Sequence, residues 1–431
     1  MATWSNWAGT ATADVRVEIP QSVAAIQHAV VAAAESGTRV KPIGAGHSFT
    51  SVGVTDGVQL RPEGVTGIVA ADRETGLVTV LAGTRLHDLN EALWEHGLSM
   101  TNLGDIDVQT ITGAISTGTH GTGAKMGGIA TQVRALQLVT ADGQLRDVSA
   151  HAEPDLFRAG CVGLGALGVI TSVTLQCEPA FALHAQESPA PLDEVLDDLD
   201  TLVDGHDHFE FYWFPHTRAT LTKRNNRRRV EDGLAPLGRM RHYLDDEVLA
   251  NTAFGAINKF TTRRPHVIPR ANRLASRLLT AREYTDRSYR VFASPRRVKF
   301  REMEYAVPRE SVPHVLAEIE AYLRRSGEQV GFPVEVRFAA ADDLWLSTAH
   351  GRASGYIAVH QYIRRDHERY FAAVEAIARS VDGRPHWGKL HDRDAASLRT
   401  TYPRFDDFVA LRDKLDPNRI FGNAYLDRVL G

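Results

Sequence analysis

The chain has 431 residues, of which 43% are hydrophobic and 24% charged, the composition of an ordinary soluble protein. Its two cysteines are too few for a disulfide framework, so we expect a reducing, cytoplasmic setting. The first residues lack the basic-then-apolar pattern of a secretory signal, and no window approaches the roughly 18 apolar residues of a membrane span.

The formal net charge of −4 is unevenly spread. Residues 216–301 contain 21 Lys+Arg against 7 Asp+Glu, so the rest of the chain is acidic. Such a basic segment can contact an acidic partner or a membrane surface peripherally, or it can be a solvated surface. Its densest run, KRNNRRR, has no interleaved aromatic residues to stack on bases, so we expect no nucleic-acid partner.

Short β-like and helical stretches alternate along residues 1–178. Ser22 predicts the start of a helix that ends at Gly37. RVKPIG is a predicted strand that runs into a glycine-rich turn. A hairpin turning at residues 72–76, a helix over residues 84–97 and a strand pair turning at residues 142–143 follow.

The composition changes near residue 178, and we place a domain boundary there. The first predicted domain covers residues 1–178 and the second covers residues 179–431. In the second, HFEFYWF, PVEVRF and GYIAVHQY predict strands, and residues 311–325 and 366–380 predict helices.

A literal GxGxxG occurs in VGLGALGVI, at Gly163, Gly165 and Gly168. A Rossmann dinucleotide site needs this pattern to open a helix, with an acidic residue about 20 positions later. Here β-branched, strand-like residues follow, and the next acidic residue lies too far on. We therefore expect no Rossmann core.

Two other glycine-rich stretches, GAGHSFT (residues 44–50) and STGTHGTG (residues 116–123), lie close together in the sequence. Glycine lets the backbone approach a ligand, and successive exposed N–H groups bind anions such as a diphosphate. Either stretch alone could be a tight turn between strands. The two together favour a binding site for a dinucleotide, and no magnesium or other metal is implied.

KPIGAGHSFT followed by NLGDIDVQTITGAISTGTHGTG resembles the FAD-binding domain of the vanillyl-alcohol oxidase family, also called PCMH-type. FPVEVRFAAADDLWLS, YIAVHQY, GRPHWGKLH and DPNRIFGNAYL are similar to its sugar-lactone oxidase branch. The resemblance covers nearly the whole chain. It implies an α+β fold, in which a two-subdomain FAD-binding domain precedes an α+β substrate domain with a large antiparallel sheet. The last part, about residues 385–431, would pack back on the first domain.

The same resemblance implies that FAD is bound covalently, through His47 and the 8α-methyl group of the flavin. Gly104 matches a position where glycine leaves room for dioxygen to approach. Besides His47, fourteen positions are expected to contact the cofactor: Gly44, Ala45, Gly46, Ser48, Phe49, Gly104, Gly113, Thr117, Gly118, His120, Gly121, Gly168, Val169 and Ile170.

Glu335 and Arg337 stand two residues apart in a predicted strand, so alternation places both on one face. A carboxylate beside a guanidinium can bind sugar hydroxyls, although the pair could also be an exposed ion pair. By resemblance, Lys389 stabilises the charge of the reduced flavin and His360 binds or deprotonates the substrate. Further expected pocket residues are Gln109, Thr110 and Tyr362.

These observations together predict an FAD-dependent oxidation of a sugar-derived hydroxyl. The leading substrate is an aldonolactone such as L-gulono-1,4-lactone or D-arabinono-1,4-lactone. An alditol such as xylitol or sorbitol is the alternative, and a non-catalytic flavin carrier is the third. The electron acceptor is dioxygen or a redox protein.

Overall fold

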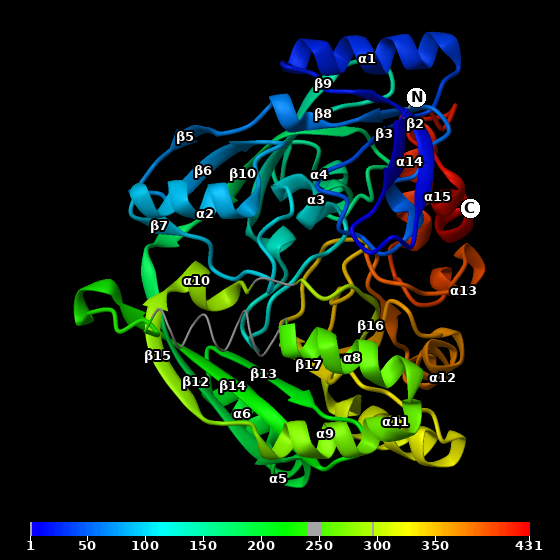
Figure 1. Cartoon of the computed structure of the whole chain (residues 1–431). Coiled ribbons are helices and arrows are strands. Elements are labelled where there is room, and N and C mark those ends of the chain that lie inside the picture. Colours follow the sequence, from blue (N-terminus) through cyan, green and yellow to red (C-terminus); the bar gives the residue numbers. More distant parts are fainter. Residues whose placement is uncertain (1, 239–251, 295–296) are drawn as a thin grey trace.

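The computed structural model describes residues 2–238, 252–294 and 297–431, which are organised by sheets of four, five and eight strands (Figure 1). The four-stranded sheet has the order β1 (Ala2–Ser5), β2 (Thr12–Glu18), β4 (Val58–Leu60), β3 (Val40–Pro42). Helix α1 (Val23–Ser36) connects β2 to β3. As predicted, the Ser22 hydroxyl accepts a hydrogen bond from the N–H of Ala25, and Gly37 ends the helix with a φ of 65°.

The five-stranded sheet is antiparallel, in the order β5 (Ile68–Ala71), β6 (Leu77–Leu81), β10 (Val169–Gln176), β8 (Val133–Val139), β9 (Leu145–Ser149). Its helices are α2 (Leu86–Glu95), α3 (Ile111–Ser116) and α4 (Pro154–Gly160). Strand β10 begins directly after Gly168, so the GxGxxG pattern opens a strand and not a helix. The predicted absence of a Rossmann motif there is confirmed.

Helix α3 was not predicted from the sequence, because its residues run into the second glycine-rich stretch. The Thr110 hydroxyl accepts a hydrogen bond from the N–H of Gly113, and this cap starts the helix despite the glycine inside it.

The eight-stranded antiparallel sheet confirms the large sheet expected in the second half. Its order is β15 (Arg282–Arg287), β12 (Phe181–Pro191), β14 (Ala219–Arg229), β13 (His208–Trp213), β17 (Val334–Ala339), β18 (Ser354–Tyr362), β16 (Phe300–Pro308), β19 (Arg384–Pro385). The chain leaves the five-stranded sheet at Gln176, pairs β11 (Glu178–Pro179) with β7 (Leu98–Ser99), and enters the large sheet at Phe181. Our boundary at residue 178 falls in this connection.

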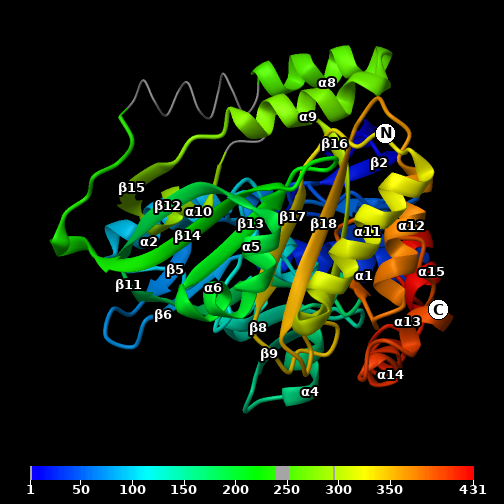
Figure 2. The same ribbon diagram turned by 90° about the horizontal axis from the view of Figure 1, so that it is seen from below.

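Four helices cover one face of the eight-stranded sheet (Figure 2): α5 (Leu192–Asp197), α6 (Leu199–Gly205), α11 (Val312–Ser326) and α12 (Glu368–Arg379). The strands turn alternate apolar side chains towards them, including Phe211, Met303, Val336 and Ile357. The other face of the sheet carries polar residues and faces the first domain.

The last helices, α13 (Ala395–Arg399), α14 (Phe405–Leu415) and α15 (Ala424–Leu430), return to the first domain. The N–H of Val40 donates to the carbonyl of Ile420 at 2.7 Å. The Asn423 side chain donates to the carbonyl of Val52 at 2.9 Å. Three further helices, α8 (Phe254–Arg263), α9 (Ile268–Arg277) and α10 (Ser288–Phe292), belong to the basic part of the chain. No helix in the described ranges is long and apolar enough to cross a membrane.

A buried histidine joins the two halves of the molecule. His208 of β13 is fully buried, and its Nδ1 lies 2.8 Å from the carbonyl of Thr122, which can only accept a hydrogen bond. Burial lowers the pKa of His208 to about 4. The ring is therefore neutral in the folded protein at pH 5, where the unfolded chain binds a proton.

The pKa of His208 predicts a pH dependence of stability. Since its folded pKa (about 4) lies below the ordinary value of 6.5, acid between these values favours the unfolded state. His208→Asn should make the unfolding free energy fall less steeply over this window, by roughly 1.4 kcal/mol per pH unit. Urea unfolding of the holoprotein at several pH values measures the slope. His314→Asn, which changes an exposed histidine of α11, is the matched control and should follow the wild type. Equal slopes for all three proteins would contradict the prediction.

Candidate active site

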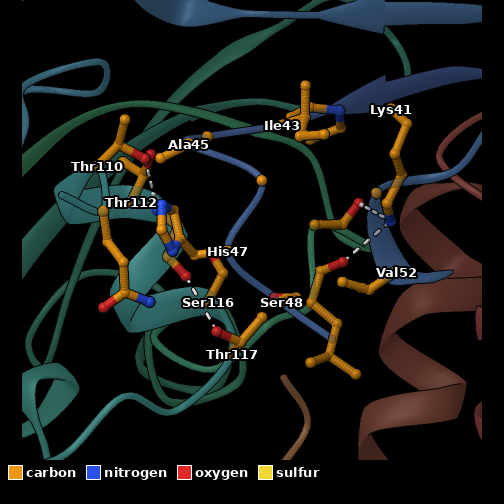
Figure 3. Close-up of a pocket in the computed structure, with 18 of the residues that line it drawn as sticks. Lys41, Ile43, Ala45, His47, Ser48, Val52, Thr110, Thr112, Ser116 and Thr117 are labelled. Carbon is orange, nitrogen blue, oxygen red and sulfur yellow. Dashed lines mark hydrogen bonds between the residues drawn. The ribbon is translucent and has the colours of Figure 1, made fainter. Parts of the chain in front are cut away.

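Two adjoining pockets meet at His47, Ser48, Gln109 and Thr117, which line both. The first pocket lies within the first domain, between the loop that follows β3 and helix α3 (Figure 3). The second lies between this domain and the polar face of the eight-stranded sheet. A ligand that spans both pockets would therefore pass His47.

Close backbone approach builds the wall of the first pocket. A Cβ atom on Gly44 would lie 2.2 Å from Oγ1 of Thr110, the oxygen that caps α3, so only glycine fits there. Gly46 has a φ of +70°, in the left-handed region that favours glycine. The first glycine-rich stretch is thus pressed against the start of α3, and its backbone can lie close to a bound diphosphate.

The expected cofactor residues fall into three groups. Lining the first pocket are Gly44, Ala45, Gly46, His47, Ser48, Gly113, Thr117, Gly168, Val169 and Ile170. Phe49 and His120 line the second pocket. Gly104, Gly118 and Gly121 are in neither set of lining residues. Gly104 lies behind the second pocket, where an added Cβ would be 3.2 Å from the carbonyl oxygen of His120.

His47 stands at the junction in a mainly buried position, stacked on Trp7 with 5.8 Å between ring centroids. Burial, followed by the nearby charges of Arg85 and Lys389, lowers the pKa of His47 to about 4. Its imidazole is therefore neutral near pH 7. A neutral ring keeps a nitrogen lone pair, which is the form that can bond to a carbon electrophile.

Gln109 offers a further indication of a ligand. Its Nε2 donates to Oγ1 of Thr119 at 3.1 Å, but its Oε1 is buried and has no hydrogen-bond partner in the described part of the chain. A buried acceptor without a partner costs free energy. An N–H or O–H group of a bound ligand would supply the missing donor, so the residues present fit a cofactor lying across both pockets.

The floor of the second pocket is a patch of charge on four neighbouring strands, β13, β17, β18 and β16. In one cross-strand row Tyr212 pairs with Glu335, Glu335 with Ala358, and Ala358 with Glu304. The carboxylates of Glu335 and Glu304 thus flank Ala358, which has the smallest side chain of the row. The charged side chains of this floor form three groups.

The first group is centred on Arg337, which forms an ion pair with Glu335. Its guanidinium also lies 3.0 Å from Oε2 of Glu210 and 3.4 Å from Oδ2 of Asp105. Burial alone would lower the pKa of Arg337, but these carboxylates raise it well above its ordinary value. Tyr212 donates to Glu335 at 2.8 Å, and burial and the neighbouring carboxylates raise the pKa of its hydroxyl. This group presents a fixed cation beside a carboxylate.

The second group joins Lys389, Glu302 and His360. Nζ of Lys389 lies 2.5 Å from Oε2 of Glu302, and Nε2 of His360 lies 3.5 Å from the other oxygen. Burial would raise the pKa of Glu302, but Lys389 and His360 together outweigh it and lower the pKa to about 2. Burial likewise opposes the charge of Lys389, yet Glu302 and Glu304 raise its pKa. The ammonium and the carboxylate therefore remain charged inside the pocket.

The third group is Glu304 with His120 and His386. Nε2 of His120 lies 3.2 Å from Glu304. Burial would raise the pKa of this carboxyl, but His120, His386 and Lys389 together outweigh it and lower the pKa. Burial lowers the pKa of His386 to about 4. The ligand atoms lie within 4.8 Å of one another, so the group is compact enough for a metal ion. The cation of Lys389, which acts on the same carboxylate, disfavours a second cation there.

The expected substrate residues are only partly together. Glu335, Arg337, His360 and Lys389 all line the second pocket, and Gln109 lines both pockets. Thr110 lies in the first pocket, where its hydroxyl caps α3. Tyr362 is at the end of β18 and lines neither pocket.

Sequence reasoning missed four carboxylates and two other side chains of this site: Asp105, Glu210, Glu302, Glu304, Tyr212 and His386. A signal existed in HFEFYWF and FREMEYAVP. Both place polar residues at every second position of an otherwise apolar strand, which is unusual on a face that should be buried.

Comparison with known proteins agrees with this geometry. Residues 173–429 match the D-arabinono-1,4-lactone oxidase family, and residues 16–149 match the FAD binding domain family. The chain is 44% identical to L-gulono-1,4-lactone dehydrogenase of Mycobacterium tuberculosis, over 99% of both chains. It is 35% identical to L-gulonolactone oxidase of Mus musculus, over 99% of this chain and 98% of that one. It is 30% identical to an alditol oxidase of a Streptomyces species, with the same coverage.

Among solved structures, the fold is similar to that of cholesterol oxidase from Brevibacterium sterolicum, with a TM-score of 0.82 over the whole chain and 96% of the other, at 20% identity. The fold and its first pocket define a PCMH-type FAD-binding oxidoreductase. Within that class, the chain belongs to the D-arabinono-1,4-lactone oxidase family.

The contact between Gly44 and Thr110 predicts a specific loss of cofactor. Gly44→Ala should fold but bind little FAD, because the new methyl group displaces the loop or the cap of α3. Adding Thr110→Ala removes the opposing oxygen and should restore part of the binding. The absorbance of flavin per protein, after purification, measures the effect. Gly205→Ala is the control, since a Cβ there meets nothing within 4 Å. Full flavin content in Gly44→Ala would show that close packing of Gly44 against Thr110 is not needed to bind FAD.

Proposed function

We propose that this protein oxidises a hydroxyl of an aldonolactone, with FAD as the resident cofactor. The leading candidate substrates are L-gulono-1,4-lactone and D-arabinono-1,4-lactone. The observation that carries the proposal is the second pocket, where the Glu335–Arg337 pair and Lys389 converge beside His47. The similarity to lactone dehydrogenases and oxidases over the full chain supports it.

Glu335 and Arg337 bind substrate oxygens in this proposal. The carboxylate accepts a hydrogen bond from a hydroxyl, and the guanidinium donates to a carbonyl or ring oxygen. Tyr212 donates a hydrogen bond to Glu335, and Glu210 forms an ion pair with Arg337. Both Glu335 and Arg337 are almost fully buried. The sugar therefore meets groups that are already oriented, so little reorganisation accompanies binding.

His360 is the proposed acceptor of the hydroxyl proton. Its Nδ1 lies 3.2 Å from the carbonyl of Pro333, which only accepts, so in the neutral ring the hydrogen is on Nδ1. In that tautomer Nε2 carries the lone pair that would receive the proton. Glu302, 3.5 Å from Nε2, stabilises the proton that the ring receives.

FAD supplies the acceptor for the hydride, at the flavin N5 atom. The first pocket would hold its diphosphate and adenine end, and His47 would form the covalent bond. Lys389 would lie against the part of the ring that becomes negative on reduction, where a fixed cation lowers the barrier. Besides Glu335, Arg337, His360 and Lys389, we propose Gln109 as a contact of the cofactor or the sugar.

The electron acceptor is proposed to be dioxygen, admitted past Gly104, or a redox protein. We place the protein in the cytoplasm, with peripheral contact to a membrane through part of the basic segment of residues 216–301.

The covalent bond predicts the fate of the yellow colour in acid. Flavin should stay in the acid-precipitated pellet of the wild type and should move to the supernatant for His47→Ala, which still binds FAD without the bond. Spectra of the two fractions measure this. His87→Asn, on the exposed surface of α2, should behave as the wild type. A colourless wild-type pellet would exclude covalent attachment while leaving FAD binding intact.

The substrate is tested by anaerobic bleaching of the flavin, which does not depend on the final acceptor. L-Gulono-1,4-lactone should bleach the wild-type flavin faster than xylitol does. Lys389→Met should keep its flavin but bleach roughly 10²- to 10³-fold more slowly, because it lacks the cation that stabilises the developing charge.

Lys414→Met, which removes an exposed lysine of α14, is the control and should bleach at the wild-type rate. Faster bleaching by xylitol would favour an alditol oxidase. If neither compound bleached the flavin, both would be excluded as substrates. A protein that holds flavin but is reduced by no sugar would be a flavin carrier.

A further inference from the structure

Helices α8 and α9 form a hairpin, residues 254–278, at the outside of the second domain. Figure 2 shows the two helices next to each other at one edge of the molecule, and in Figure 1 they lie in front of the lower half. The side chain of Asn272 anchors the hairpin, because it donates to the carbonyls of Pro215 and Val330, both at 3.0 Å.

The hairpin buries mainly polar residues and exposes apolar ones, which is the reverse of an ordinary surface helix. Its buried positions are mostly small and polar: Asn258, Thr261 and Asn272, with Ile268. Four of its large apolar side chains point outwards: Ile257 is 46% exposed, Phe260 51%, Leu274 60% and Leu278 70%. A surface helix normally buries its apolar stripe. Four outward apolar residues on one hairpin therefore indicate that something apolar covers this face.

The charge of the hairpin is entirely positive. Residues 248–281 contain no Asp or Glu and six basic residues, all exposed: Lys259, Arg263, Arg264, Arg270, Arg273 and Arg277. Within the described ranges none of the six forms an ion pair with a carboxylate. On α9, Arg270, Arg273 and Arg277 share one side of the helix, and Leu274 and Leu278 lie on the adjoining side.

Elsewhere in the described part of the basic segment, several charges are paired with carboxylates inside the molecule. Lys223 of β14 lies 3.2 Å from Glu210, Arg227 pairs with Glu178, and Arg282 lies 2.8 Å from Glu187. Among the described basic residues of this segment, the six on the α8–α9 hairpin form the largest exposed group without carboxylate partners in the described ranges.

We infer that the α8–α9 hairpin docks the protein on an anionic lipid surface. Exposed apolar side chains beside a row of Lys and Arg are the signature of a helix that lies in the membrane interface. The leucines and Phe260 enter the acyl boundary, and the arginines stay at the level of the anionic headgroups. A second copy of the chain fits less well, since a twofold contact would set like charges against each other. This inference deepens the peripheral contact proposed above and does not depend on the substrate.

The hairpin also abuts the wall of the active-site pocket. The ring of Phe254, the first residue of α8, contacts that of Phe332 at 4.7 Å between centroids. Phe332 in turn contacts Phe300 at 5.7 Å and His360 at 6.1 Å, and these two residues line the second pocket. A membrane bound by the hairpin therefore lies against the outer side of the aromatic wall of the site.

Vesicle co-sedimentation of the full-length holoprotein tests the inference. The wild type should sediment with vesicles of equimolar phosphatidylcholine and phosphatidylglycerol, should be released by salt, and should stay in solution with phosphatidylcholine alone. Arg270→Gln/Arg273→Gln/Arg277→Gln should weaken the partition by roughly a hundredfold, given the usual contribution of each basic residue at an anionic surface. Leu274→Ser/Leu278→Ser should weaken it by at least about tenfold.

Matched variants keep the result specific. Arg324→Gln/Arg325→Gln/Arg369→Gln makes the same change of charge on α11 and α12, and Val69→Ser replaces an apolar residue of β5 that is 62% exposed. Both should sediment like the wild type. Flavin content and thermal unfolding report that each variant is folded.

The inference is overturned if the wild type does not bind the anionic vesicles, which would point to an acidic protein partner. It is also overturned if the two hairpin variants bind as the wild type does, or if the matched variants lose binding equally. None of these readouts uses turnover, so they separate the docking surface from the proposed lactone chemistry.

Discussion

The structure depends on the alternation of side chains along β13, β17, β18 and β16. Each strand turns its apolar residues towards α5, α6, α11 and α12 and its ionisable residues towards the pocket. Val336 packs in the core, while Glu335 and Arg337 on either side of it face the site. A slip of one residue would bury the charges in the core and expose the apolar side chains. The register that builds the core therefore also builds the site.

Pairing makes this concentration of buried charge tolerable. A single buried carboxylate costs several kcal/mol, unless a cation or donors compensate it. Here the compensating groups come from distant parts of the chain: Arg337 from the same sheet, Lys389 from the segment after β19, and His120 from the first domain. The charged face of the sheet is complete only when the first domain is docked on it. The same docking brings the pocket beside His47, so cofactor site and sugar site are assembled by one interface.

The α8–α9 hairpin departs from the pattern of the rest of the molecule. Elsewhere buried faces are mostly apolar, and exposed charges are often paired. The hairpin instead buries asparagine and exposes leucine beside arginines that have no carboxylate partner in the described ranges. Local rules of folding are commonly broken where a protein meets a partner. Because Phe254 links the hairpin to Phe332 and thus to His360, this surface and the active site share one aromatic layer.

The sequence by itself determined the features that depend on local pattern. Ser22 and Gly37 bound α1, the β-branched run after Gly168 excluded a Rossmann turn, and the spacing of Glu335 and Arg337 put them on one face. The resemblance of its motifs also indicated the FAD-binding fold. Only the tertiary structure decided what each face meets. Thr110 caps α3, Tyr362 lies outside both pockets, and Glu302 and Glu304 join Lys389 and His120. Periodicity specifies which side of a strand is buried. The partner across the interface comes from residues that are distant in the sequence, and no local pattern encodes such a contact.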